Sequence, residues 1–151
     1  MASLTVERYV KAIYKICDEG GHHAATTGQI ATALRVSPGT VTSMLKTLRE
    51  NGLAIYAPYE GVRLTEQGNQ LAIRLLKRHR LLELFLTKVL GVKREEVHDD
   101  ADQLEHAVSE FLIERIDAYL GHPHFVLHRE EAEGDMDSQE ELSQREPVRV
   151  E

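Results

Sequence analysis

The fold is decided by residues 26–49, TTGQIATALRVSPGTVTSMLKTLR. Thr26 can cap a short helix, and after a tight turn Ser37 can cap a second one with Pro38 at its first position, where proline costs no hydrogen bond. The second helix has an apolar face formed by Val41, Met44, Leu45 and Leu48. The stretch therefore predicts two helices joined by a tight turn, which is the helix-turn-helix arrangement.

The segments on either side complete a winged helix. Apolar side chains between residues 4 and 17 recur at three- and four-residue spacing, which is typical of one face of an amphipathic helix. Residues 53–56 and 62–64 are rich in β-branched and aromatic side chains and flank the turn-forming residues 57–61, which predicts a two-stranded hairpin. We therefore predict a mainly α fold whose residues 1–65 form a winged helix-turn-helix domain that binds DNA.

A second, helical domain is predicted after the wing. Apolar positions at helical spacing predict one long helix over residues 66–90. Asp99 or Asp100 then caps a further helix. Its inward face is predicted to hold Leu104, Val108, Leu112, Ile116 and Tyr119. Residues 66–128 are expected to form this helical domain, and the polar, acidic residues 129–151 a disordered tail.

The formal net charge of -7 is unevenly distributed. Residues 22–80 hold eight lysines and arginines against three acidic residues, whereas residues 81–128 hold four against ten and residues 129–151 hold three against nine. Nucleic acid is attracted by local positive charge rather than by the net charge of the chain. The acidic total therefore does not exclude DNA binding by the first half.

Composition also limits the compartment and the metal chemistry. The single cysteine, Cys17, excludes an intramolecular disulfide and a cysteine-cluster metal site. No stretch approaches the roughly 18 apolar residues of a membrane span, and the start has no signal-peptide pattern. We therefore expect a soluble, cytoplasmic protein without a membrane partner.

The predicted recognition helix carries small and polar side chains at its N-terminal end, where such a helix approaches bases and phosphates. Cations further along it, polar side chains before the preceding helix and the wing can bind the DNA backbone. The candidates are Thr26, Thr27, Gln29, Ser37, Pro38, Gly39, Thr40, Thr42, Ser43, Lys46, Arg49 and Arg63, with Tyr59 of the wing. The alternative is that these residues only cap helices or face solvent. Without a large base-reading side chain at the helix start, DNA shape and methyl contacts are expected to carry much of the specificity.

A cluster of carboxylates and histidines follows the wing. A histidine and a glutamate four residues apart share one face of the long helix, and three such side chains share a face of the later helix, with one more histidine just before it. The candidates are His79, Glu83, His98, Asp102, Glu105 and His106. If the helices pack, these donors suit Mn²⁺ or Fe²⁺ and can take Co²⁺, Ni²⁺ or Zn²⁺ in vitro. The alternative is a solvated acidic face with incidental histidines.

Five stretches resemble the diphtheria-toxin-repressor and manganese-transport-regulator family of metal-dependent transcriptional regulators. They are residues 9–14 (YVKAIY), 36–42 (VSPGTVT), 61–65 (GVRLT), 78–83 (RHRLLE) and 97–106 (VHDDADQLEH). The resemblance implies a homodimer with an N-terminal winged helix and, over residues 66–128, a helical metal-binding and dimerisation domain. It also implies that Mn²⁺ or Fe²⁺ acts as corepressor on a palindromic operator upstream of metal-transport genes. This chain resembles the short form, without the SH3-like domain that some relatives carry.

The resemblance places the family's metal ligands on the six candidates but fails in the first helix. The family commonly has Asp or Met directly before the matching tyrosine, and some members have Glu two residues after it; here these positions hold Arg8 and Lys11. A cation cannot coordinate a metal. Two alternatives follow. Metal binds only within the helical half, or the two cations pair with Asp102 and Glu105 and replace one metal ion.

These observations lead to one main hypothesis and three others. In the main hypothesis, bound metal fixes the angle between the two halves and selects a dimer that fits successive major grooves. Such a dimer is expected to bury Phe111, Leu112 and Tyr119. The others are a winged-helix regulator that no longer needs metal, a metallohydrolase, and a helical interaction module without a DNA role. An enzyme is not expected, since no separate general base, nucleophile or phosphate-binding loop accompanies the cluster.

Overall fold

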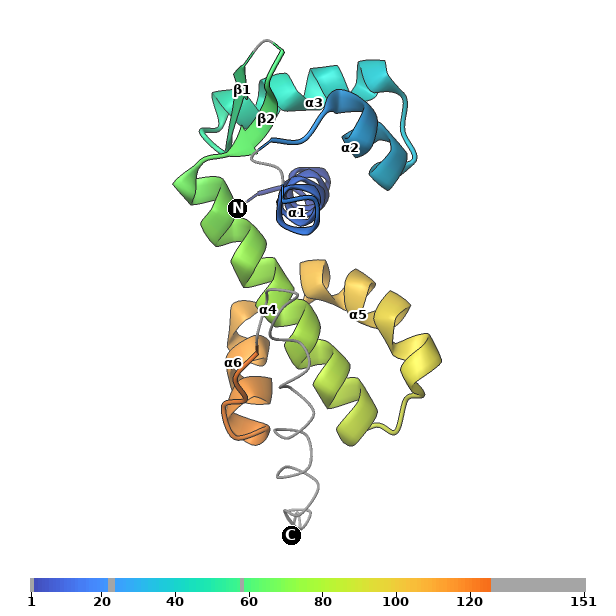
Figure 1. The fold of residues 1–151 in the computed structure, drawn as a ribbon. Coiled ribbons are helices and arrows are strands. Elements are labelled where there is room, and N and C mark those ends of the chain that lie inside the picture. The colour runs from blue at the N-terminus through green and yellow to red at the C-terminus, as the bar shows by residue number, and fades with distance from the viewer. Residues whose placement is uncertain (1, 22–23, 58, 126–151) are drawn as a thin grey trace, which may run out of the picture. The chain divides into compact units, whose positions relative to one another are not determined.

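The computed structural model describes residues 2–21, 24–57 and 59–125, and Figure 1 traces its elements. The chain divides into two compact units, Met1–Leu76 and the part that begins at Lys77. Helix α4 (Glu66–Lys88) contributes to both. Among the described helices, none has the length and apolar character that a membrane span requires. The predicted tail, residues 129–151, lies outside the described residues.

The first unit contains the helices and the hairpin in the predicted order. They are α1 (Leu4–Glu19), α2 (Thr27–Leu34), α3 (Pro38–Glu50), β1 (Ala54–Ala57) and β2 (Gly61–Leu64). Side chains from the three helices and from β2 are fully buried at its centre: Val10, Ile13, Ile30, Val41, Leu48 and Val62. The prediction of a mainly α fold with a winged helix at its start is confirmed.

Local hydrogen bonds define the helix-turn-helix. The Thr26 hydroxyl accepts the backbone N–H of Gln29 at 3.1 Å, and Gln29 Oε1 accepts the backbone N–H of Thr26 at 2.9 Å, which is a capping box. Arg35 ends α2 in the left-handed region at φ 55°. Ser37 caps α3 by accepting the backbone N–H of Thr40 at 3.2 Å. These bonds confirm the predicted caps and the turn between them.

The wing is tied to the segment before α2. Strands β1 and β2 pair antiparallel with Ala54 opposite Leu64. Ala25 forms a bridge to Val62 through two backbone hydrogen bonds of 2.8 Å. Gly61 has φ +93°, and a Cβ at this position would lie 2.6 Å from the Ala25 carbonyl oxygen. Only glycine fits there without backbone movement, so the close approach holds the hairpin against the helix-turn-helix.

The second unit packs two helices against α4. Helices α5 (Arg94–Ala107) and α6 (Glu110–Tyr119) lie on either side of α4 in Figure 1. The three helices share a buried core of Leu81, Leu82, Leu84, Leu86, Val97, Ala101, Ile113, Ile116 and Leu120. This core positions α5 along the C-terminal half of α4, where the candidate metal ligands lie.

The predicted bounds of the later helix are wrong. Helix α5 begins at Arg94 rather than near residue 99, so His98 lies inside it and not before it. The helix then ends at Ala107, because Val108 is extended and the Ser109 hydroxyl caps α6 by accepting the backbone N–H of Leu112 at 3.2 Å.

Two predicted inward positions of the later helix are also wrong. The break after Ala107 changes which face of α6 is buried, and Leu112 and Tyr119 are 47% and 58% exposed. On α2, Ile30 and Ala31 are buried, and helical spacing places Ala31 on the same face as the half-buried Leu34.

Candidate metal centre and nucleic-acid interface

His79 is the residue at which the candidate metal ligands meet. It lies on α4, and its side chain is 7% exposed. Its Nε2 atom is 2.6 Å from Glu83 Oε1 and 3.1 Å from His98 Nδ1, and the last two atoms are themselves 3.1 Å apart. Helices α4 and α5 thus bring three donors together. The group is open to solvent through His98, whose side chain is 62% exposed.

The other ring nitrogen of His79 faces a buried carboxylate. His79 Nδ1 is 3.2 Å from Oε2 of Glu105, whose side chain is completely buried. Glu105 Oε1 is in turn 3.2 Å from His106 Nε2. The donors of His79, Asp102 and Glu105 lie within 4.8 Å of one another, as do those of the first group. Five of the six candidates therefore fall into two groups that share His79, while His106 contacts Glu105 from outside both.

Glu83 is held ionised by its histidine neighbours. Burial alone would raise the pKa of its carboxyl. The hydrogen bond from His79 and the charge of that ring, followed by the same effects of His98, outweigh burial and lower the pKa from 4.5 to about 2. An ionised carboxylate is the form that coordinates a cation. The electrostatics of this group are therefore suited to binding one.

The chemistry of the donor set fits a divalent first-row cation. Imidazole nitrogens and carboxylate oxygens without thiolate suit Mn²⁺ and Fe²⁺. A neutral imidazole has one N–H and one nitrogen lone pair. If the proton of a neutral His79 is on Nδ1, the nitrogen nearer Glu105, then Nε2 is left to coordinate an ion beside Glu83 and His98. A neutral His79 can therefore serve only one of the two groups at a time.

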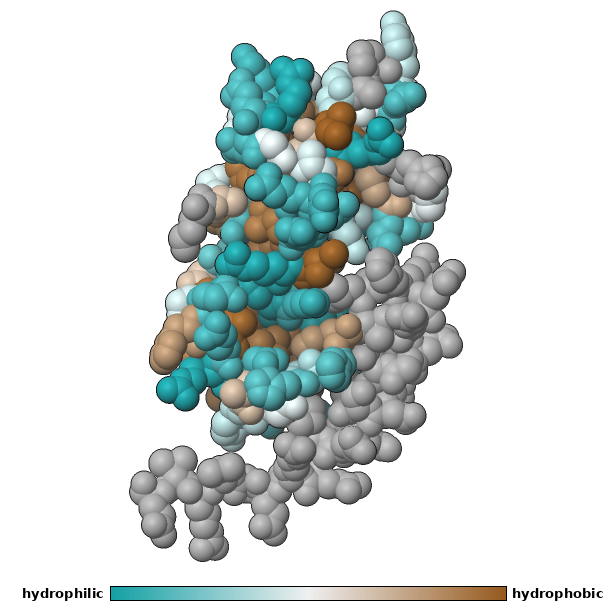
Figure 2. Space-filling model, turned by 90° about the vertical axis from the view of Figure 1, so that its left-hand side faces the viewer, coloured by the Kyte–Doolittle hydropathy of each residue, from teal (hydrophilic) through white to brown (hydrophobic). Residues whose placement is uncertain are grey.

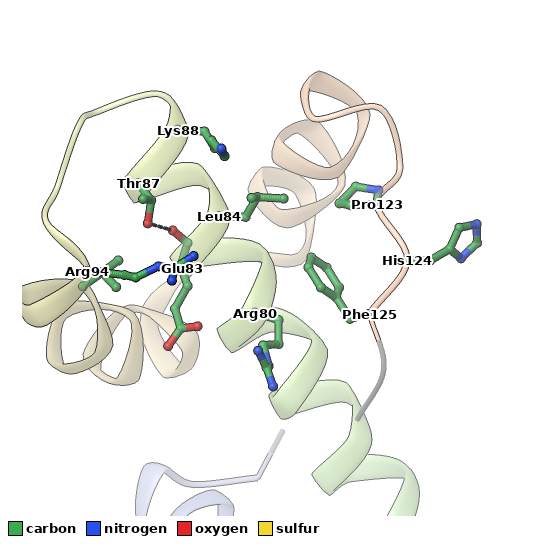
Figure 3. Close-up of a pocket in the computed structure, with 10 residues that line it drawn as sticks. Arg80, Glu83, Leu84, Thr87, Lys88, Arg94, Pro123, His124 and Phe125 are labelled. Carbon is green, nitrogen blue, oxygen red and sulfur yellow. Dashed lines mark hydrogen bonds between the residues drawn. The ribbon is translucent and has the colours of Figure 1, made fainter. Parts of the chain in front are cut away.

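A cavity of about 140 Å³ opens beside Glu83 in the second unit. Its walls include the cations Arg80, Lys88 and Arg94, and Figure 3 shows Arg94 reaching from α5 toward Glu83. The Thr87 hydroxyl donates to the Glu83 carbonyl at 2.6 Å. Sequence reasoning missed these neighbours, although the spacing of Arg80, Glu83 and Thr87 along one helix face was a usable signal. Three cationic side chains therefore line a cavity that Glu83 also lines.

The predicted DNA-contacting residues lie on the surface of the first unit. All are exposed except the half-buried Thr27: Thr26, Gln29, Ser37, Pro38, Gly39, Thr40, Thr42, Ser43, Lys46, Arg49, Arg63 and Tyr59. A groove brings several of them together. Its lining residues are Thr27, Thr42, Ser43, Leu45, Lys46, Arg49 and Tyr56. The helix-cap interpretation also holds for Thr26, Gln29 and Ser37, since all three side chains make capping bonds.

Tyr56 is a groove residue that sequence reasoning assigned only to a strand. It lies on β1 and is 47% exposed. Its ring adds an aromatic side chain to the groove lined by Lys46 and Arg49, and its position just before the wing turn was the available signal.

Comparison with known proteins assigns the chain to a family. The model described as "Iron dependent repressor, N-terminal DNA binding domain" matches residues 1–62. The model described as "Iron dependent repressor, metal binding and dimerisation domain" matches residues 65–133. The chain belongs to the iron-dependent repressor family. Members of this family are metal-dependent transcriptional regulators, and the resemblance seen in the five sequence stretches is confirmed.

Individual members of the iron-dependent repressor family agree with this assignment. The HTH-type transcriptional regulator MntR of Bacillus pumilus is 39% identical over 116 residues, which cover 77% of this chain and 78% of that protein. The solved manganese regulator SloR is 36% identical with a TM-score of 0.67, over 78% of this chain and 54% of SloR. The solved metal-dependent transcriptional regulator MtsR is 35% identical with a TM-score of 0.71, over 80% of this chain and 55% of MtsR. The chain spans about half the length of these two solved proteins.

Proposed function

We propose that this protein is a DNA-binding repressor of metal-uptake genes that requires Mn²⁺ or Fe²⁺ and acts in the cytoplasm as a homodimer on a palindromic operator. One observation carries the proposal. Two groups of nitrogen and oxygen donors share the buried His79, in the part of the chain that matches a metal-binding domain, and that part follows a winged helix.

The ion is held, in this proposal, by residues of α4 and α5 alone. His79, Glu83 and His98 form the first group, and Asp102 and Glu105 form the second with His79. All five lie in the second unit. The proposal therefore needs no metal ligand at positions 8 and 11, where this chain has Arg8 and Lys11. His106 supports Glu105 through their 3.2 Å contact. The bound ion supplies positive charge to this set of carboxylates; Co²⁺, Ni²⁺ and Zn²⁺ are expected to bind the same donors in vitro.

DNA binding is proposed for the groove of the first unit. Lys46 and Arg49 neutralise phosphates from α3, and Thr42 and Ser43 approach the base edges from the same helix. The groove geometry and the match of residues 1–62 to a DNA-binding domain support this assignment.

A homodimer is supported by the exposed apolar side chains of α6. Phe111, Leu112 and Tyr119 are 67%, 47% and 58% exposed. Figure 2 presents the side on which α6 lies in Figure 1, and brown surface is visible there among teal. Apolar side chains that are exposed in one copy are the kind that a twofold interface covers. Two copies then present two recognition helices to successive half-sites.

A binding assay with and without metal tests the proposal. A random 30-bp duplex pool is first enriched on the protein in Mn²⁺, and the enriched sequence is then titrated in Mn²⁺ and in chelator. We expect a twofold-symmetric sequence and an affinity that rises roughly 5- to 150-fold with metal. Equal affinity in chelator would instead support a regulator that no longer needs metal, the hypothesis that Arg8 and Lys11 favour. Enrichment of no sequence would contradict DNA binding itself.

A further inference from the structure

Arg78 directly precedes His79 on α4, and its side chain is 8% exposed. Its Nη1 donates to the carbonyl oxygen of Glu105 at 3.0 Å, and its Nη2 donates to the carbonyl oxygen of Val108. The same Nη2 lies 3.9 Å from the Glu110 carboxylate. All three contacts therefore fall where α5 ends and α6 begins.

These contacts meet a need of the α5 terminus. The last four carbonyl groups of a helix have no partner within the helix, and this end carries partial negative charge. The guanidinium of Arg78 offsets the partial negative charge with its own positive charge. It also satisfies the carbonyls, because its two terminal nitrogens can donate to two of them at once. A lysine ammonium at this position could not span both carbonyls in the same geometry. Arg78 thus braces the end of α5 against α4.

Glu105 is consequently held at two points by consecutive residues of α4. Arg78 holds its backbone carbonyl at 3.0 Å, and Nδ1 of His79 lies 3.2 Å from its carboxylate. A shift or rotation of α5 along α4 would break both contacts together. Each candidate group also takes donors from both helices, so the register between α4 and α5 sets the spacing of the donors.

Core packing by itself does not account for an arginine here. Replacing a buried charge by an apolar side chain of similar volume is often neutral or stabilising. The Nε–H of Arg78 is buried and has no hydrogen-bond partner among the described residues, which adds a desolvation cost. What the apolar side chain lacks is the pair of bonds to the two carbonyls.

We propose that Arg78 is a positioning residue of the metal centre, which fixes the α4–α5 register and thereby the placement of Glu105 opposite His79. The inference rests on the proposed function, since it concerns the same donors. Residues that orient metal ligands from outside the coordination shell typically change metal affinity 10- to 100-fold when they are replaced.

The test compares three variants of the full chain. R78M fills the buried space without binding the carbonyls. R78K keeps the positive charge but lacks the two terminal nitrogens that donate to both carbonyls. K77M is the matched control, because Lys77 directly precedes Arg78 on α4 and is exposed. Mn²⁺ affinity is measured by calorimetry, the spectrum of bound Mn²⁺ at saturation by electron paramagnetic resonance, and amide exchange of residues 105–108 in the metal-free protein.

We expect the Kd of Mn²⁺ to rise roughly 10- to 100-fold in R78M, less in R78K, and not in K77M. The bound Mn²⁺ spectrum should change in R78M, which a loss of stability alone would not cause, and exchange near Glu105 should accelerate. Wild-type affinity in folded R78M, or equal losses in R78M and K77M, would overturn the inference. Should R78M not fold, wild-type affinity in R78K would overturn it instead. Failure of the wild-type chain to bind Mn²⁺ would contradict the proposed function. Unchanged amide exchange near Glu105 in metal-free R78M would contradict the role of Arg78 in holding the end of α5, whether or not the chain binds Mn²⁺.

Discussion

His79 Nδ1 lies 3.2 Å from Oε2 of Glu105, and the carboxylate is completely buried. A buried carboxylate is costly unless it has a partner of opposite charge or a hydrogen-bond donor. The His79 ring is the neighbour of opposite charge when it is protonated, and its other nitrogen, Nε2, faces Glu83 and His98. The pair thus links the interior of the second unit to the solvent-facing group formed with Glu83 and His98.

Replacing Glu105 by glutamine should weaken metal binding. The neutral amide no longer favours a proton on His79 Nδ1, so the orientation and basicity of the ring are lost. We expect the Kd of Mn²⁺, measured by calorimetry, to rise roughly 10- to 100-fold. Glu114→Gln is the control, because it removes an exposed carboxylate from α6. An unchanged Kd in the Glu105 variant would show that this carboxylate has no part in the centre.

Replacing His79 by alanine should abolish tight Mn²⁺ binding altogether. This residue belongs to both donor groups, so its loss leaves the first with only Glu83 and His98 and the second with only Asp102 and Glu105. His122→Ala is the matched control, since it breaks another histidine–carboxylate pair of the same unit, in which His122 Nδ1 lies 2.5 Å from Asp117 Oδ2. Calorimetry of both variants decides the matter. Retention of a tight ion by the His79 variant would place the metal elsewhere.

Removal of Lys46 and Arg49 should weaken DNA binding and reduce its dependence on salt. Each lost phosphate contact lowers the slope of log K against log salt by roughly 0.9. The double alanine variant should therefore lose about 1.8 from that slope in a fluorescence titration with the enriched duplex. Lys93→Ala removes a comparable exposed cation from the second unit and should leave the slope unchanged. Equal slopes in all three proteins would argue against the groove.

A charge on α6 should dissociate the proposed dimer. Phe111 is 67% exposed and lies under the Arg115 guanidinium, 5.3 Å from the ring centroid. The Phe111→Lys substitution would remove this ring and bring a second cation beside Arg115 into the interface. Loss of a central aromatic anchor commonly costs about 2 kcal/mol or more, so light scattering should detect monomer at concentrations where the wild type is dimeric. Leu90→Lys changes another exposed apolar residue, 61% exposed, and should keep the dimer.

The Glu83 carboxyl should make the metal-free protein less stable in acid. Its pKa is lowered from 4.5 to about 2 in the folded state. A lowered pKa contributes stability that is present above the ordinary value and is lost as the pH falls toward the folded one. Glu83→Gln should therefore flatten the pH dependence of the unfolding free energy between 4.5 and 2, by at most about 3 kcal/mol. Denaturant unfolding in chelator measures this difference, and parallel curves for both proteins would contradict it.

The winged helix was predictable because its signals are local. The caps at Thr26 and Ser37, the proline after Ser37 and the apolar spacing of α3 all act within one or two helical turns. The break between α5 and α6 was missed for the opposite reason. Apolar spacing continues across it, whereas the extended Val108 carbonyl is bound by Arg78, 30 residues earlier in the chain.

The candidate site divides in the same way. The sequence by itself determined which donors exist, since helical spacing places His79 with Glu83, and Asp102 with Glu105, whatever surrounds them. Only the tertiary structure decided that both groups converge on one imidazole, and that Glu83 and Glu105 face different nitrogens of its ring. The reason is physical: the register between two helices depends on packing and on long-range bonds such as those of Arg78, which leave no periodic trace in the sequence.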